Sequence, residues 1–210
     1  MMSPLEIAAV LASAIGIWLS TQRKLASWPV ILAACFLYAL VFHGAKLYSD
    51  MLLQFVFAAF AVYGWWHWWR GVKEEGSVRV ERLSRAGLAS GIVMGAAGSL
   101  LLGHLMARYT DASLPHIDAS LTSFSLVAQF WSTRKHIANW WLWIVVDNIY
   151  VGVFVYKLLY LTAGLYAFFV FLAVVGLRSW QKALREQETA NPGPSLVPPS
   201  NLGAAESNPN

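Results

Sequence analysis

Four side chains suited to ligand binding lie along one short apolar segment, residues 138–150, with the sequence ANWWLWIVVDNIY. They are Trp140, Trp143, Asp147 and Tyr150, at successive spacings of three, four and three residues. These spacings place the four side chains on one face of a helix. Such a face suits a flat polar or cationic ring, because indoles stack on rings and attract cations, and a carboxylate balances positive charge or accepts hydrogen bonds.

Structural roles compete with this binding role. An ionisable residue inside a membrane usually faces the bundle interior or a cavity, but Asp147 can also pair with a neighbouring Asn or Lys. Trp140 has a counterpart, Trp28, in an earlier part of the chain with a similar sequence, so it can instead anchor the fold. Two further polar residues are candidates. Gln129 offers both a donor and an acceptor, and Gln54 suits helix–helix hydrogen bonding as well as it suits ligand contact.

No catalytic or metal-binding motif accompanies these residues. The sequence lacks a glycine-rich phosphate loop, an HExxH zinc motif and a nucleophile elbow, so we expect no enzymatic activity and no cofactor. The five histidines lack metal-ligand spacing, and the single cysteine, Cys35, cannot form an intramolecular disulfide. The basic run 79–85 is short and interrupted by Glu81, so nucleic acid is not expected as a partner.

The elements that position these residues are apolar segments that can cross a bilayer. Of the 210 residues, 58% are hydrophobic and only 12% are charged, about half the ~25% of soluble domains. So few charges could not cover that much apolar surface in a soluble globule. Segments with few or no charges predict an all-α membrane protein of seven helices. They are residues 7–21, 25–45, 51–69, 86–107, 119–133, 139–155 and 158–177.

The basic residues between the segments predict how the chain is oriented. Twelve of the 15 Lys and Arg residues follow the first, third, fifth or seventh segment. Cytoplasmic loops carry an excess of Lys and Arg, so we expect the N-terminus outside and the C-terminus in the cytoplasm. The opening residues lack a basic n-region, and no cleaved signal peptide is expected. After a membrane domain of residues 1–185, the Pro-, Ser- and Asn-rich residues 186–210 predict a disordered cytoplasmic tail.

Two parts of the chain are similar and align without a gap, residues 20–70 with residues 132–182. Fifteen of the 51 aligned positions are identical. The identities include Trp28 with Trp140 and Tyr38 with Tyr150. Matches between such rare residues are hard to obtain by chance, so they indicate an internal duplication. Two positions that this alignment pairs, in these ranges or where it continues beyond them, are called repeat counterparts below.

The duplication predicts the arrangement of the helices. It aligns the first three segments, about 5–70, with the last three, about 119–182, and leaves segment 86–107 between them. After three spans the chain is on the other side of the membrane, and the single fourth span returns it to the first side. Both groups of three spans then run in the same direction, which predicts a 3+1+3 parallel repeat with a pathway between its halves. Polar residues present in one half only, such as Asp147 where the other half has Cys35, are then candidates for function.

Residues 139–180 resemble the C-terminal half of the PnuC family of vitamin-precursor transporters. The similarity lies in the W-x-x-W of Trp140 and Trp143, in Asp147 and in the KLLYLT run that follows. The GWW sequence that begins at Gly64 is similar to the N-terminal half of the family.

The resemblance covers residues 5–182 and implies a bundle similar to SWEET sugar transporters, with a full-length duplication, assembled as a homotrimer in the bacterial inner membrane. It implies uptake of nicotinamide riboside by facilitated diffusion, and phosphorylation in the cytoplasm would then feed NAD synthesis. Ala138 departs from the family, because many members that carry nicotinamide riboside have an acidic residue there. The family's substrate contacts fall on Trp140, Trp143, Asp147, Gln129, Asn148 and Gln54.

Two alternative functions remain open. Family members carry thiamine, riboflavin or deoxynucleosides on the same scaffold, so the fold does not determine the substrate. Thiamine is also a flat cation and is the first alternative substrate. The second alternative is a membrane-embedded receptor or enzyme, for which a buried acid–base pair or a metal cluster would be the sign.

Overall fold

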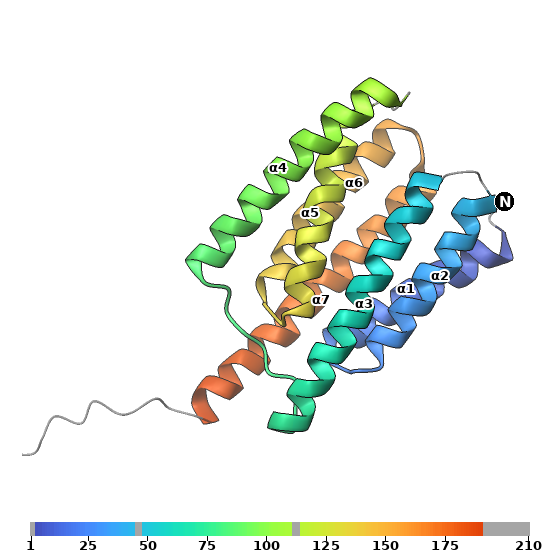
Figure 1. Cartoon of the computed structure of the whole chain (residues 1–210). Coiled ribbons are helices and arrows are strands. Elements are labelled where there is room, and N and C mark those ends of the chain that lie inside the picture. The colour runs from blue at the N-terminus through green and yellow to red at the C-terminus, as the bar shows by residue number, and fades with distance from the viewer. Residues whose placement is uncertain (1–2, 45–47, 111–113, 191–210) are drawn as a thin grey trace, which may run out of the picture.

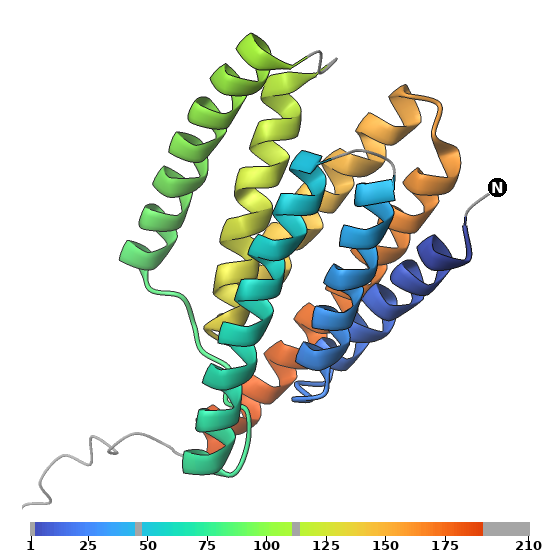
Figure 2. The same ribbon diagram turned by 45° about the vertical axis from the view of Figure 1, so that its right-hand side comes forward.

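The computed structural model describes residues 3–44, 48–110 and 114–190, and these residues form seven α-helices. Figures 1 and 2 show the helices side by side in one bundle. Each of the seven expected segments overlaps one helix. The helices are α1 (Pro4–Thr21), α2 (Ser27–Gly44), α3 (Tyr48–Glu75), α4 (Arg85–Tyr109), α5 (Pro115–Thr133), α6 (Ala138–Tyr156) and α7 (Tyr160–Ala190).

Five of the helices are long and apolar enough to cross a membrane: α1, α2, α4, α6 and α7. These five helices agree in length and composition with five of the expected spans and support a multi-pass membrane protein. The other two, α3 and α5, run alongside them but are less apolar. α5 carries many Ser and Thr residues, and α3 ends in charged turns. The crossing of α3 and α5 therefore stays a prediction.

The last helix is longer than the sequence predicted. The disordered tail was expected to begin at residue 186, but α7 continues to Ala190. The extra turn is supported by its own side chains, because Lys182 pairs with Glu186 at 3.9 Å and the Thr189 hydroxyl donates to the Glu186 carbonyl. The rest of the expected tail lies outside the described residues.

The helices pack as two triplets and one additional helix. α2 packs on both α1 and α3, and α6 packs on both α5 and α7. The triplets meet where α1 packs on α7 and where α3 packs on α5, whereas α4 packs on α5. Small residues allow that last contact to be close, and the Ser123 hydroxyl of α5 donates to the Gly95 carbonyl of α4 at 2.9 Å.

One end of the bundle collects most of the positive charge, and we name it the basic end. Here α1, α3, α5 and α7 end, and α2, α4 and α6 begin (Figure 1). Local geometry at this end is the same in both triplets. Arg23 after α1 and its repeat counterpart Lys135 after α5 both adopt a positive φ, 57° and 62°.

Four buried tryptophans form a layer near the basic end. Trp28 and Trp68 meet edge to face, with ring centroids 5.2 Å apart and an interplanar angle of 88°. Their repeat counterparts, Trp140 and Trp180, have the same geometry at 5.4 Å and 87°. Trp68 and Trp180 join the two pairs at 5.8 Å. The rings therefore form a continuous chain across the contact between the triplets.

Hydrogen bonds from this tryptophan layer join the triplets in both directions. The Trp68 indole N–H of α3 donates to the Ser132 carbonyl of α5 at 3.2 Å. The Trp180 indole N–H of α7 donates to the Ser20 carbonyl of α1 at 3.1 Å. The two donors are repeat counterparts and so are the two acceptors, so each triplet is anchored on the other by an equivalent bond.

The connection between α3 and α4, residues 76–84, crosses the basic end, and we name it the strap. Val78 and Val80 of the strap are buried, and they pack against the tryptophan layer. The apolar side chains of the strap therefore cover the surface of the tryptophan layer that faces away from the bundle centre.

The strap, which leaves the first triplet, is fastened to the second. The Glu81 N–H donates to the Lys135 carbonyl at 2.9 Å, and the Ile137 N–H donates to the Glu81 carbonyl at 3.0 Å. The Arg82 guanidinium also donates to the Glu188 carboxylate of α7, at 3.1 and 3.4 Å. The strap thus ties the end of α3 to both the α5–α6 turn and the end of α7.

Candidate binding cavity

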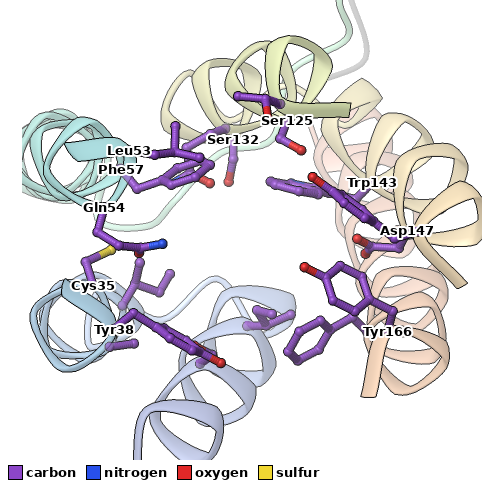
Figure 3. Close-up of a pocket in the computed structure, with 18 of the residues that line it drawn as sticks. Cys35, Tyr38, Leu53, Gln54, Phe57, Ser125, Ser132, Trp143, Asp147 and Tyr166 are labelled. Atoms are coloured by element: carbon purple, nitrogen blue, oxygen red, sulfur yellow. The ribbon is translucent and has the colours of Figure 1, made fainter. Parts of the chain in front are cut away.

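A cavity of about 660 Å³ lies between the two triplets, and all six of their helices line it (Figure 3). This volume is within the range of about 300–1,000 Å³ found for small-molecule sites. The cavity lies between the helices that contain the two similar parts of the sequence, residues 20–70 and 132–182. That it forms part of a pathway stays a prediction.

The cavity has a floor near the basic end and a mouth near the opposite end. Ser20, Ser132 and Trp140 lie at the floor, where α1 and α5 end and α6 begins. Trp140 belongs to the buried tryptophan layer, so this layer closes the floor. At the mouth, Asp50 and Asp118 lie in the first turns of α3 and α5, and Asp50 is exposed. The cavity is therefore reached from the end opposite the basic end.

Asp147 of α6 is a buried carboxylate on the wall of this cavity. Its exposed fraction is only 6%, and Figure 3 shows its carboxylate directed into the cavity. Among the described residues it makes no ion pair or hydrogen bond, so the pairing with a neighbouring Asn or Lys considered from the sequence is not formed. A buried carboxylate without a positive partner favours a cation from outside the protein.

Two aromatic side chains lie on either side of Asp147. Figure 3 shows Trp143 of α6 on one side and Tyr166 of α7 on the other, with the Tyr166 hydroxyl directed into the cavity. The Asp147 carboxylate lies within electrostatic range of the Tyr150 and Tyr166 hydroxyls. Sequence reasoning missed Tyr166, although one signal was available, because Tyr166 is the repeat counterpart of the candidate Gln54.

At the level of Asp147, the side chains on the opposite wall are neutral, whereas Asp50 lies nearer the mouth. Figure 3 places Gln54 of α3 and Cys35 of α2 across the cavity from Asp147, with the Gln54 amide directed inward. Gln129 of α5 also lines the cavity. The two glutamines therefore supply neutral donors and acceptors, in contrast to the charged wall of α6.

The structure brings together all but one of the residues singled out from the sequence. The exception is Asn148, which is exposed and does not line the cavity. Its side-chain amide donates to the Ile144 carbonyl of its own helix at 2.7 Å. One residue turns a helix by about 100°, so the neighbour of an inward Asp147 points outward. The residues that line the cavity are Trp140, Trp143, Asp147, Gln129, Tyr150 and Gln54.

The charges of the cavity all have one sign. Three carboxylates line it, Asp50, Asp118 and Asp147, and no Lys or Arg is found among its described lining residues. Like-charged groups around a low-dielectric space raise the local concentration of counter-ions, here cations. Within residues 3–44, 48–110 and 114–190, no group of three or more His, Cys, Asp or Glu side chains could hold a metal ion.

Comparison with known proteins gives a consistent set of matches. The model of the family described as nicotinamide mononucleotide transporter matches residues 3–182. The nicotinamide riboside transporter PnuC of Escherichia coli is 25% identical over 89% of this chain and 88% of the relative. The riboflavin/roseoflavin transporter RibM of Streptomyces davaonensis is 29% identical, over 83% of this chain and 82% of the relative.

A solved structure shares the fold. The crystal structure of the vitamin B3 transporter PnuC matches with a TM-score of 0.71 at 19% identity. The match covers 87% of this chain and 82% of that one.

Proposed function

The chain belongs to the nicotinamide mononucleotide transporter family, and from this premise we propose that it carries nicotinamide riboside into the cell by facilitated diffusion. The observation that carries the proposal is the buried Asp147 carboxylate, unpaired among the described residues and flanked by Trp143. Nicotinamide riboside presents a flat pyridinium cation. Its charge would neutralise the carboxylate, and its face would stack on the indole.

The charges of the cavity favour a nucleoside over its phosphorylated form. A phosphate adds about −1.5 to −2 charges near pH 7, and it would enter a space lined by Asp50, Asp118 and Asp147. No Lys or Arg of the described lining would neutralise it. Riboflavin, the cargo named for one relative, has an uncharged ring that would leave Asp147 unpaired. Thiamine is a flat cation and is the competitor that must be measured.

We propose a 3+1+3 parallel repeat for the membrane domain, with α4 as the linking helix. Its support is the recurrence of geometry at repeat counterparts: the two edge-to-face tryptophan pairs and the two reciprocal indole hydrogen bonds. With the basic end in the cytoplasm, the mouth near Asp50 opens to the outside. The described conformation is then outward-facing, and the tryptophan layer with the strap is its inner closure.

The family resemblance extends the proposal beyond the single chain. We propose a homotrimer in the bacterial inner membrane, in which each chain has its own cavity. Phosphorylation of the transported nucleoside in the cytoplasm would keep it inside and feed NAD synthesis. Size-exclusion chromatography with light scattering on the detergent-solubilised protein measures the number of chains.

Binding and uptake by the purified protein test the function. Calorimetric titration with nicotinamide riboside, thiamine, riboflavin and nicotinamide mononucleotide ranks the four compounds, and we expect nicotinamide riboside to bind most tightly. Asp147→Asn should lower the affinity for the cations at least 10-fold, whereas Asn148→Ala, its exposed neighbour, should leave it unchanged. Uptake of labelled nicotinamide riboside into liposomes should depend on Asp147 in the same way. Equal affinity of the wild type and Asp147→Asn would remove the carboxylate from the site.

A further inference from the structure

Repeat counterparts line the cavity in pairs. In five pairs both members line the cavity and are the same residue, so the two triplets contribute matching parts to its walls. These pairs are Ser13 with Ser125, Ser20 with Ser132, Tyr38 with Tyr150, Phe42 with Phe154, and Phe57 with Phe169.

At four further pairs both members line the cavity but the residues differ. These pairs are Ile17 with Gln129, Ile31 with Trp143, Cys35 with Asp147, and Gln54 with Tyr166. The second triplet supplies the carboxylate and two of the aromatic groups, whereas the first supplies aliphatic side chains, a thiol and an amide. The two triplets thus share five cavity residues, whereas four differing pairs place the carboxylate and two aromatic rings on the side of the second triplet.

We infer that Tyr166 determines specificity, and that it forms with Trp143 the two aromatic sides of a slot for the cationic ring around Asp147. In this pose Gln54, across the cavity, hydrogen-bonds with the uncharged part of the substrate. The inference rests on the proposed function and specifies the orientation in which the substrate of that function binds.

The ring of Tyr166 is held in place before any ligand arrives. It packs against Tyr150 at 4.7 Å, Phe154 at 5.1 Å and Phe169 at 5.8 Å between ring centroids. A fixed ring loses little conformational entropy on binding, so its attraction for a cation is gained at low cost. Its counterpart Gln54 has no ring face and cannot form this contact.

Only one orientation brings the cation to the buried Asp147 carboxylate. If the substrate turned around, its cation would lie against Ile31 and Cys35, which offer no negative charge. Asp147 would then face the uncharged end of the substrate and remain buried and unpaired among the described residues. Such an unpaired charge is costly inside a membrane, so the reversed pose is disfavoured.

Two forms of one ligand separate the role of the ring from a general loss of binding. The probes are nicotinamide riboside and its reduced dihydropyridine form, which has nearly the same shape but no positive charge. The variants are Tyr166→Leu, Tyr166→Phe and Gln54→Leu, and the control is Phe168→Leu, which changes an exposed ring of the same helix. Calorimetric titration gives both affinities for each variant. Their ratio does not depend on the folded fraction.

The expected results differ between the two sides of the cavity. Tyr166→Leu weakens binding of the cation about 2- to 30-fold, the range of a cation–π contact, and changes binding of the neutral form much less. Tyr166→Phe keeps the ring and leaves the ratio unchanged. Gln54→Leu weakens both forms by the same factor, about 2- to 10-fold, because it removes a hydrogen bond to an uncharged group. Phe168→Leu changes neither affinity.

The outcomes that overturn the inference are distinct from failure of the function. If the wild type prefers the cation and Tyr166→Leu keeps that preference, Tyr166 is not a side of the slot. If Gln54→Leu weakens only the cation, the orientation is wrong. If the wild type binds neither form, the proposed function fails, and this inference fails with it.

Discussion

At the scale of single residues, Trp143 and Trp28 have different surroundings although both belong to similar helices. Trp143 lines the cavity one helical turn from Asp147. Trp28 is 1% exposed, packs edge to face on Trp68 and does not line the cavity. We expect Trp143→Ala to weaken binding of nicotinamide riboside about 5- to 150-fold, the usual loss when a stacking indole is removed.

The matched variant Trp28→Ala should instead lower stability. Replacing a buried Trp by Ala costs about 3–5 kcal/mol of unfolding free energy, while the folded fraction should bind with nearly wild-type affinity. Calorimetric titration and thermal unfolding of both purified variants measure the two effects. Equal affinities of the wild type and Trp143→Ala would show that the indole does not contact the substrate.

Residue spacing predicted the part of the cavity wall that α6 contributes but could not assign every neighbour. The 3.6-residue period places Trp140, Trp143, Asp147 and Tyr150 on one face, and all four line the cavity. Asn148 was carried over from a family resemblance without that test of periodicity, and it points outward. The position of Tyr166 depends on how α7 packs against α6, and a local sequence pattern does not predict such packing between helices.

At the scale of the elements, two glycines let each triplet close around its tryptophan. A Cβ at Gly176 of α7 would lie 2.7 Å from the Trp140 indole, and one at Gly64 of α3 would overlap Trp28. The indoles are rigid and buried, so the helices would have to move apart. We expect Gly176→Ala to lower the unfolding free energy by about 1–3 kcal/mol.

The control for this prediction is Gly152→Ala on α6. No atom lies within 4 Å of a Cβ at Gly152, and Ala is favoured over Gly in a helix by about 1 kcal/mol. Thermal unfolding should therefore show a small gain for Gly152→Ala and a loss for Gly176→Ala. Equal shifts of the two variants would mean that the close contact does not limit packing.

A charge introduced at a buried position of the strap should release the strap from the tryptophan layer. Val80 is 3% exposed and packs against the tryptophan layer, so Val80→Asp would bury an unpaired carboxylate. We expect faster trypsin cleavage after Arg79 or Arg82 than in the wild type. Ser77→Asp, at an exposed position of the strap, should be cleaved at the wild-type rate. Unchanged cleavage of Val80→Asp would show that these contacts do not hold the strap.

Charge placement predicted the helices better than their connections. Segments with few or no charges overlap all seven helices, because a charge within a membrane is costly. The strap consists of ordinary loop residues, and its attachment depends on Glu81 meeting the α5–α6 turn, a contact between distant parts of the chain. The polar composition after residue 185 predicts disorder too early, because Glu188 of α7 is held in an ion pair by the distant Arg82.

At the scale of the whole molecule, the basic end predicts which side of the membrane each helix end faces. In a Cys35→Ser background, a membrane-impermeant maleimide added outside should label Tyr109→Cys. It should not label Glu186→Cys, which lies toward the basic end. Tyr109 is exposed and Glu186 lies on the outer turns of α7, so the membrane decides which of them is reached. The reverse pattern would invert the orientation, and it would place the mouth of the cavity in the cytoplasm.

Transport should require no gradient other than that of the substrate. A proton relay needs successive acids or bases, whereas Asp147 has no hydrogen-bonded partner among the described residues. An uncoupler should therefore leave the initial rate of uptake into kinase-free liposomes unchanged. A rate that falls with the proton gradient would contradict facilitated diffusion, and the same liposomes with an added sodium gradient provide the matching control.

The contrast between Cys35 and Asp147 across the cavity has a genetic consequence. If the cavity were instead built by two identical three-helix subunits, any mutation at the position of Cys35 would also appear at the position of Asp147. An Asp at both would set two like charges facing each other across a space of low dielectric constant, and one of them would have to remain protonated. When one gene encodes both triplets, a mutation changes only one of the two counterpart positions. An asymmetric binding site, with a carboxylate on one side only, can therefore evolve between two triplets of similar sequence.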